Sequence, residues 1–277
     1  MALLLLASPK GGVGKTTLSA GLADAMARAG RRVIALDLDP QNALRLHFGV
    51  PLTDRAGFMT ALPQRAPWRA SLRTTPSGVQ LLPHGGTDLR GAVALHAAIE
   101  REPELLAGPV REMLAEPGAI VLADLPPGAS PVLAALAPLA SLLVAVLLPD
   151  AASTALLPEI DQGHFLGRGT LAALGAPRIV VALNQVDASS AMSRRTAEAV
   201  ARHLGPRLVG GIAREDSVAE ALAWQRPLLQ HAPHSTAARD LSDLASAVLA
   251  LLPPPSAPPQ AAQGAGSPPM PPLLGIG

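Results

Sequence analysis

The stretch that decides the fold is Ser8-Pro9-Lys10-Gly11-Gly12-Val13-Gly14-Lys15-Thr16-Thr17, near the amino terminus. It follows the apolar run Leu3–Ala7 and leads into a segment with helical spacing, so it joins a buried strand to a helix. Glycines let such a loop curl until successive backbone N–H groups point inward, and the start of the helix adds partial positive charge. Because this arrangement binds phosphate groups, the stretch predicts an α/β fold with a nucleotide site.

The side chains of this loop suit the parts of a nucleoside triphosphate bound with Mg²⁺. We expect Lys15 to reach the β- and γ-phosphates, Thr16 to ligate Mg²⁺, and Thr17 to contact the α-phosphate. The expected nucleotide-binding set in the loop is Gly11, Gly12, Val13, Gly14, Lys15, Thr16 and Thr17. Lys10 and Lys15 are the only lysines among 22 basic side chains, and all the others are arginine. Since a compact ammonium suits the space between phosphates, this usage argues against a chance glycine-rich turn.

Seven short apolar runs alternate with helical patterns along the chain. These runs are Leu3–Ala7, Val33–Leu36, Val79–Leu82, Ile120–Ala123, Leu142–Leu148, Ile179–Leu183 and Leu208–Ile212. Most of them are apolar throughout, which is typical of strands that helices cover on both faces. The alternation therefore predicts an α/β, doubly wound, mostly parallel sheet.

We expect one ATPase domain over residues 1–252, followed by a tail at 253–277. The first helix should end near Gly30, which suits a carboxyl-terminal cap. The last helix should run from about Ser235 to Leu252, with an apolar stripe of Leu241, Leu244, Val248 and Leu251. Beyond Leu252 the chain is rich in Pro, Ala, Gly and Ser and has no charged residue, which predicts a disordered or polyproline-like tail.

Carboxylates follow two of the predicted strands. Asp37 and Asp39 end the second strand, and Asp124 closes the apolar strand Ile120–Ala123. Ligands of open α/β sheets bind at this carboxyl edge. We expect Asp39 to orient the attacking water, Asp37 to support Mg²⁺ or the loop, and Asp124 to hold Mg²⁺ through its water shell. The candidate metal-binding set is Thr16, Asp37, Asp39 and Asp124, and the candidate catalytic set is Lys10, Lys15 and Asp39.

The strand Ile179–Leu183 ends in Asn184-Gln185-Val186-Asp187. An amide at this edge is well placed to read adenine, and Asp187 is expected to assist. The alternative interpretation of Asn184 is an ordinary turn residue at a strand end.

Composition excludes several other classes of protein. The 277 residues carry a net charge of +1, so bulk charge does not indicate a nucleic-acid binder, and without cysteine there is no thiolate chemistry. No apolar stretch approaches the roughly 20 residues of a membrane span, so we expect a cytoplasmic protein without direct membrane insertion. The histidines show no metal-ligand spacing, and we expect His231 and His234 to be solvated.

These motifs together resemble the ParA/MinD family of deviant Walker ATPases over residues 1–252. The resemblance rests on Lys10–Thr17, Asp37–Gln41, Asp124–Gly128, Asn184–Asp187 and Arg214–Leu241. It implies a homodimer that encloses ATP, slow hydrolysis used as a switch, and a Lys10 that reaches the nucleotide of the other subunit. It also places Arg214 near the adenine.

Within that family the chain is most similar to the BcsQ (YhjQ) group, which is encoded in bacterial cellulose synthase operons. The segments that carry this likeness are Asp39–Gly49, Trp68–Gly85 and Arg214–Glu220, and Asn42–Phe48 reads as an amphipathic segment. The likeness implies partners among the cellulose synthase subunits at the cytoplasmic face of the inner membrane.

Two alternatives stay open from the sequence. A partition-type ATPase would bind non-specific DNA through a basic face of Arg194, Arg195, Arg202, Arg207 and Arg239. A MinD-like ATPase would dock on the membrane, but that class ends in a basic amphipathic helix, whereas this chain ends in an uncharged proline-rich segment.

Overall fold

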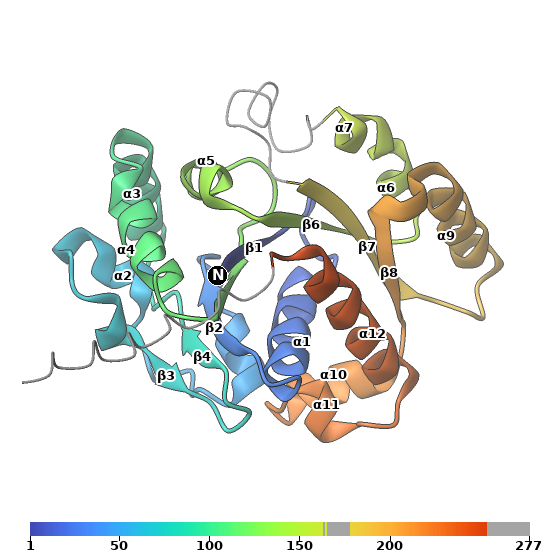
Figure 1. Ribbon diagram of the computed structural model, residues 1–277, viewed down its shortest axis with the longest axis horizontal. Helices are drawn as coiled ribbons and strands as arrows, with labels where there is room; N and C mark the ends of the chain where they lie inside the picture. The colour runs from blue at the N-terminus through green and yellow to red at the C-terminus, as the bar shows by residue number, and fades with distance from the viewer. Residues whose placement is uncertain (163, 165–177, 254–277) are drawn as a thin grey trace, which may run out of the picture.

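The computed structural model describes residues 1–162, 164 and 178–253, so the predicted tail at 253–277 lies outside them apart from Pro253. An eight-stranded sheet runs through the molecule in the order β3-β4-β2-β5-β1-β6-β7-β8 (Figure 1). Its strands are β1 (Ala2–Ala7), β2 (Arg32–Asp37), β3 (Arg73–Thr74), β4 (Gln80–Leu82), β5 (Ala119–Asp124), β6 (Leu142–Leu147), β7 (Arg178–Val186) and β8 (Leu208–Ala213). All pairs are parallel except β3 with β4, which confirms the predicted doubly wound, mostly parallel class.

Helices cover both faces of the sheet. On one face lie α1 (Lys15–Arg28), α10 (Asp216–Ala223), α11 (Leu228–His231) and α12 (Thr236–Leu251). On the other lie α2 (Phe58–Ala61), α3 (Leu89–Arg101), α4 (Glu104–Leu114), α5 (Pro131–Leu136), α7 (Leu157–Asp161) and α9 (Ala191–Leu204). The short α6 (Ala151–Ala155) follows β6. Short 3₁₀ turns are η1 (Leu44–Phe48), η2 (Leu62–Gln64), η3 (Trp68–Ser71), η4 (Ala137–Leu139) and η6 (Gly205–Arg207).

The alternation of side chains along β1 explains the two cores. Leu3 and Leu5 belong to the core under α3, α4 and α5, whereas Leu4 and Leu6 belong to the core under α1 and α12. Successive residues of a strand point to opposite faces, so a strand buried on both faces has to be apolar at every position. This is why the continuous apolar runs predicted the strands.

The first and last helices confirm the sequence predictions. The helix α1 ends at Arg28, and Gly30 follows with a φ of +76°, where an L side chain would be strained. In α12, Leu241, Leu244 and Val248 are buried. The two helices pack so closely that a Cβ on Gly21 would lie 2.3 Å from a methyl carbon of Leu241. The helix that begins at the phosphate loop is therefore fixed by the end of the chain.

Two details of the fold differ from the sequence predictions. The antiparallel edge strand β3 was not predicted, because two residues carry no periodicity. The segment Asn42–Phe48 is not amphipathic, since Arg45 and His47 are buried together with Leu44 and Phe48. The Arg45 guanidinium is turned inward, where it donates to backbone carbonyls of the same loop.

His231 is also not solvated as expected. Its side chain is 19% exposed at the end of α11, with Nε2 3.6 Å from a Glu220 carboxylate oxygen. His234 is exposed as predicted.

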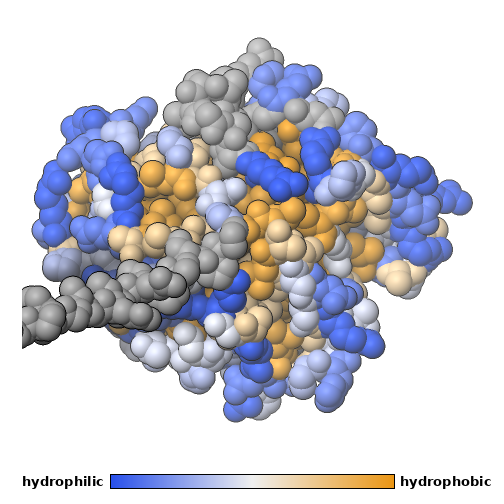
Figure 2. Space-filling model, in the orientation of Figure 1, coloured by the Kyte–Doolittle hydropathy of each residue, from blue (hydrophilic) through white to orange (hydrophobic). Residues whose placement is uncertain are grey.

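Hydrophilic and hydrophobic residues occupy different parts of the surface that Figure 2 shows. Hydrophilic residues cover the outer helix α9 at the right, whereas the middle of this face is hydrophobic. No helix within the described part of the chain is both long and apolar enough to traverse a bilayer.

Candidate functional site

The loop after β1 forms one wall of a concavity at the carboxyl edge of the sheet. Gly12 and Gly14 have φ values of +77° and +79°, so both positions need glycine. The concavity has a volume of about 220 Å³. It is lined by Ser8, Gly11, Gly12, Val13, Gly14, Lys15, Thr16, Asp39 and Pro127. The structure thus brings Asp39 to the predicted phosphate loop, although the two are more than twenty positions apart in the sequence.

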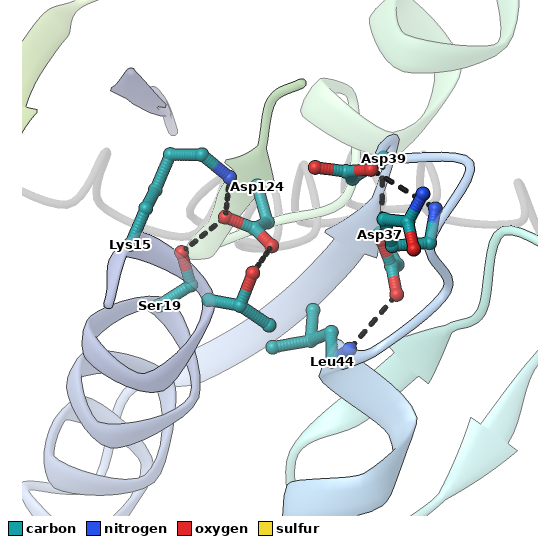
Figure 3. Close-up of polar contacts among 8 residues, drawn as sticks. Lys15, Ser19, Asp37, Asp39, Leu44 and Asp124 are labelled. Carbon is teal, nitrogen blue, oxygen red and sulfur yellow. Dashed lines mark hydrogen bonds and ion pairs between the residues drawn. The ribbon is translucent and has the colours of Figure 1, made fainter. Parts of the chain in front are cut away.

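Beneath this loop, three side chains of α1 converge on Asp124 (Figure 3). The Asp124 carboxylate accepts from Lys15 Nζ at 2.8 Å, Thr16 Oγ1 at 2.7 Å and Ser19 Oγ at 2.8 Å. Asp124 is fully buried and the Lys15 side chain is 6% exposed. A buried carboxylate is stable only when it is paired and hydrogen-bonded, and these three donors meet that requirement. The predicted lysine, threonine and aspartate therefore form one unit, with Ser19 as a member that the sequence prediction missed.

Asp37 lies beside Asp124 and organises the next loop (Figure 3). The two residues are register partners in the β2–β5 pair, and Asp37 is fully buried. Its two carboxylate oxygens accept the backbone N–H groups of Asp39 at 3.2 Å and Leu44 at 3.0 Å. Burial raises the pKa of Asp37 well above its ordinary value, and the charge of Asp124 raises this pKa further. Of the two predicted roles for Asp37, this geometry favours support of the loop.

Asp39 lines the concavity, and a hydrogen bond within its own turn positions its carboxylate. Its Oδ1 accepts from the backbone N–H of Gln41 at 2.9 Å, as in an Asx turn. The side chain is half-buried and lines the concavity opposite the glycine loop. A carboxylate in this place can orient a water molecule toward a phosphate in the concavity.

A second cavity continues the first one toward β7 and β8. It has a volume of about 340 Å³, which lies in the range of small-molecule pockets. Its lining consists of Gly14, Thr17, Asn184, Gln185, Ala213, Arg214, Glu215, Asp216, Val218, Ala219 and Leu222. Gly14 borders both cavities, so a ligand with a phosphate end and a base end can span them.

Asn184 connects this second cavity to the loop. Its Nδ2 donates to the Val13 carbonyl at 2.8 Å, and the side chain is nearly buried. A Cβ on Gly14 would lie 2.3 Å from the same nitrogen. Asn184 therefore supports the loop from behind while it lines the pocket predicted for the base. The predicted Arg214 also lines this pocket, whereas Asp187 lines a neighbouring one of about 240 Å³.

A family model described as "Cellulose biosynthesis protein BcsQ" matches residues 1–249. The chain belongs to the BcsQ family. BcsQ of Escherichia coli K12 is 44% identical over 31% of this chain and 34% of its own length, so the matched stretch spans about a third of that relative. The chromosome-partitioning ATPase Soj of Thermus thermophilus is 32% identical over 89% of this chain and 95% of its own length. Among solved structures, the septum site-determining protein MinD of Pyrococcus horikoshii has a TM-score of 0.73 at 22% identity, covering 89% of this chain and 95% of that one.

The remaining member of the predicted BcsQ-family site is Lys10. Its Nζ lies 2.7 Å from the Asp150 Oδ2 of the same chain. Asp150 follows β6, next to β1 in the sheet, and was not among the residues predicted for the site. Its short Leu-Pro-Asp context is typical of an ordinary turn, so no sequence signal distinguished it.

The residues of α10 that line the second cavity were also not predicted individually. Val218, Ala219 and Leu222 are apolar residues of an ordinary amphipathic helix. Only the resemblance of the stretch Arg214–Leu241 to the family pointed to this region.

Proposed function

We propose that this BcsQ-family chain binds MgATP and uses it as a switch for dimerisation, in the service of a cellulose synthase. The observation that carries the proposal is the convergence of Lys15, Thr16 and Ser19 on the buried Asp124, beneath a glycine loop that faces Asp39. A lysine, a hydroxyl and a carboxylate at this spacing are the groups that hold Mg²⁺ and the β- and γ-phosphates in P-loop proteins.

The residues present fit such a ligand. The two left-handed glycines leave the loop backbone free to direct N–H groups into a cavity without side chains in the way. Lys15 and the start of α1 would neutralise phosphate charge, and Thr16 with Asp124 would hold the metal ion. The ion, when bound, supplies charge neutralisation on the β- and γ-phosphates. Asp39 would orient the attacking water, which makes the chain a weak ATPase.

Solved relatives support this choice of ligand. The Pyrococcus horikoshii MinD structure contains Mg-ADP, and a cobyrinic acid a,c-diamide synthase of Mycobacterium smegmatis with a TM-score of 0.68 contains an ATP analogue and magnesium. Asn184 and Arg214 would then contact the adenine end, and Asp187 would assist from the neighbouring pocket.

The dimer part of the proposal rests on Lys10. It lies on the same carboxyl edge as the nucleotide cavities, and its side chain is 30% exposed. We propose that it contacts the ATP of a second copy. The protein would act in the cytoplasm and be recruited to the inner membrane through cellulose synthase subunits.

The cellulose role is tested in the organism that encodes the chain. Chromosomal Lys15→Ala and Asp39→Ala substitutions should each abolish or strongly reduce secreted, cellulase-digestible glucan while protein levels stay unchanged. The control is Asp88→Asn, a conservative change at an exposed helix cap on α3. Normal cellulose secretion in both substituted strains would contradict the role.

A partition-type function is the second candidate, because α9 presents cationic side chains. Arg194, Arg195 and Arg202 are exposed on this helix. The Asp39→Ala protein, which should retain ATP, is mixed with non-specific duplex DNA at moderate salt, with and without MgATP. Tight ATP-dependent binding that weakens steeply with salt would favour this candidate over the cellulose role. Absence of binding in both states would exclude it.

A further inference from the structure

Lys10 is held by a carboxylate of its own chain. The strands β1 and β6 are parallel neighbours, and Lys10 and Asp150 follow their carboxyl ends. The Nζ–Oδ2 distance is 2.7 Å, and Lys10 has no second ionic partner in the structure as described over 1–162, 164 and 178–253. The side chains are 30% and 41% exposed, so solvent and other ions can reach the pair.

Asp150 is itself fixed in place. It is the amino-terminal cap of α6, where its Oδ1 accepts from the Ser153 N–H at 2.7 Å. The buried Ser153 in turn accepts the N–H of Leu148 with its hydroxyl at 3.2 Å. Burial raises the pKa of Asp150, but the hydrogen bonds from Lys10 and Ser153 outweigh this and leave the pKa below its ordinary value. Asp150 is therefore a positioned anion, whereas Lys10 ends a flexible side chain.

The Lys10–Asp150 pair lies where it can affect the association of two copies. A lysine ammonium that contacts the phosphates of another subunit has to point away from its own chain. Asp150 competes with those phosphates for the same ammonium, and its charge repels a triphosphate that approaches this edge. Since both effects oppose association, the pair is a barrier to dimerisation that the nucleotide of the partner copy can overcome.

We propose that Asp150 is a latch that holds Lys10 within its own subunit until the nucleotide of a second copy displaces it. This inference rests on the proposed ATP-dependent dimer and adds its regulation. One exposed ion pair changes an equilibrium constant by up to about fivefold. This is small enough for one bound triphosphate to break the Lys10–Asp150 pair.

The test compares Asp150→Asn with the parent in the full-length Asp39→Ala background. Asparagine caps a helix about as well as aspartate, so the substitution removes the charge and keeps the cap. Asp88→Asn is the matched control, because Asp88 caps α3 through Gly91 N–H at 2.7 Å and has no ionic partner among the described residues. The dissociation constant of the dimer is measured by sedimentation in saturating MgATP, and ATP binding is measured separately with a fluorescent analogue.

Because two such pairs break when one symmetric dimer forms, Asp150→Asn should tighten the dimer by up to about 25-fold. Asp88→Asn should leave it unchanged. With Lys10→Ala added, the protein should stay monomeric with or without Asp150→Asn. A dimer that is unchanged or weaker in Asp150→Asn overturns the latch and leaves the proposed dimer intact. If Asp150→Asn restores a dimer in the absence of Lys10, the latch is also overturned, because the gain would then come from the loss of a negative charge and not from the release of Lys10. If the parent binds the nucleotide yet stays monomeric, both the latch and the dimer of the proposed function are rejected.

Discussion

At the scale of single residues, the site depends on buried polar side chains whose hydrogen bonds are satisfied. Asp124 accepts hydrogen bonds from three side chains of α1, and Asp37 accepts them from two backbone N–H groups of the following loop. The sequence predicted Lys15, Thr16 and Asp124, because a lysine and a hydroxyl after a glycine loop and an acid at a strand end have few other uses. It did not predict Ser19 or Asp150, because a serine inside a helix and an aspartate after a proline are common everywhere.

Asp124→Ala should destabilise the fold even without nucleotide. It would leave the nearly buried ammonium of Lys15 without a counter-charge, and breaking a buried pair in this way costs about 3–5 kcal/mol. Urea denaturation of the nucleotide-free protein measures the loss. Asp150→Asn, whose ion pair is partly exposed, is the control and should change the free energy of unfolding by less than about 1 kcal/mol. A similar small change for Asp124→Ala would show that Lys15 is solvated.

The raised pKa of Asp37 predicts a pH dependence of stability. Because the folded pKa lies well above the ordinary 3.8, the neutral acid is favoured in the fold. The stability that Asp37 contributes is complete below about pH 4 and is lost as the pH rises through the folded pKa, by up to about 1.4 kcal/mol per unit.

Asp37→Asn removes the loss of stability at higher pH, because asparagine does not ionise. Without nucleotide and Mg²⁺, the free energy of unfolding of the variant relative to the parent should therefore rise as the pH increases above about 4. Denaturation curves for both proteins at several pH values check this. Parallel pH profiles would contradict the assignment of a raised pKa to Asp37.

At the scale of elements, the strands were predictable and the short connections were not. The apolar runs identified seven strands, since most of these strands face helices on both sides. The strand β3 and the turn η1 have two and five residues. Segments this short take their structure from tertiary contacts, such as the bonds from Arg45 to the carbonyls of its own loop.

The contact between α1 and α12 predicts a compensating pair of substitutions. Gly21→Val should destabilise the protein by about 1–3 kcal/mol, because its side chain would overlap Leu241. Leu241→Ala alone leaves a cavity and should cost about 2–5 kcal/mol. The double variant should be more stable than the sum of the single losses by at least about 1 kcal/mol, as thermal and urea unfolding would show. Strict additivity would mean that the two helices do not pack at this position.

At the scale of the whole molecule, the sheet order gathers distant segments on one edge. The order β2-β5-β1-β6-β7 brings Asp39, Asp124, the glycine loop, Asp150 and Asn184 together. Strand order is a property of long-range packing, which the sequence pattern does not contain. The sequence could nevertheless predict that all of these except Asp150 share an edge, because the carboxyl ends of parallel strands lie together.

We propose that MgATP joins two copies of this chain through Lys10, and this dimerisation would double the molar mass in solution. Light scattering is measured on the full-length Asp39→Ala protein with MgATP and with MgADP, and on the Lys10→Ala, Asp39→Ala double variant with MgATP. We expect a mass of about twice the 28.2 kDa of the chain for the first sample alone, and the monomer mass for the other two. A monomer with MgATP bound, or a dimer that forms equally well without Lys10, would contradict it.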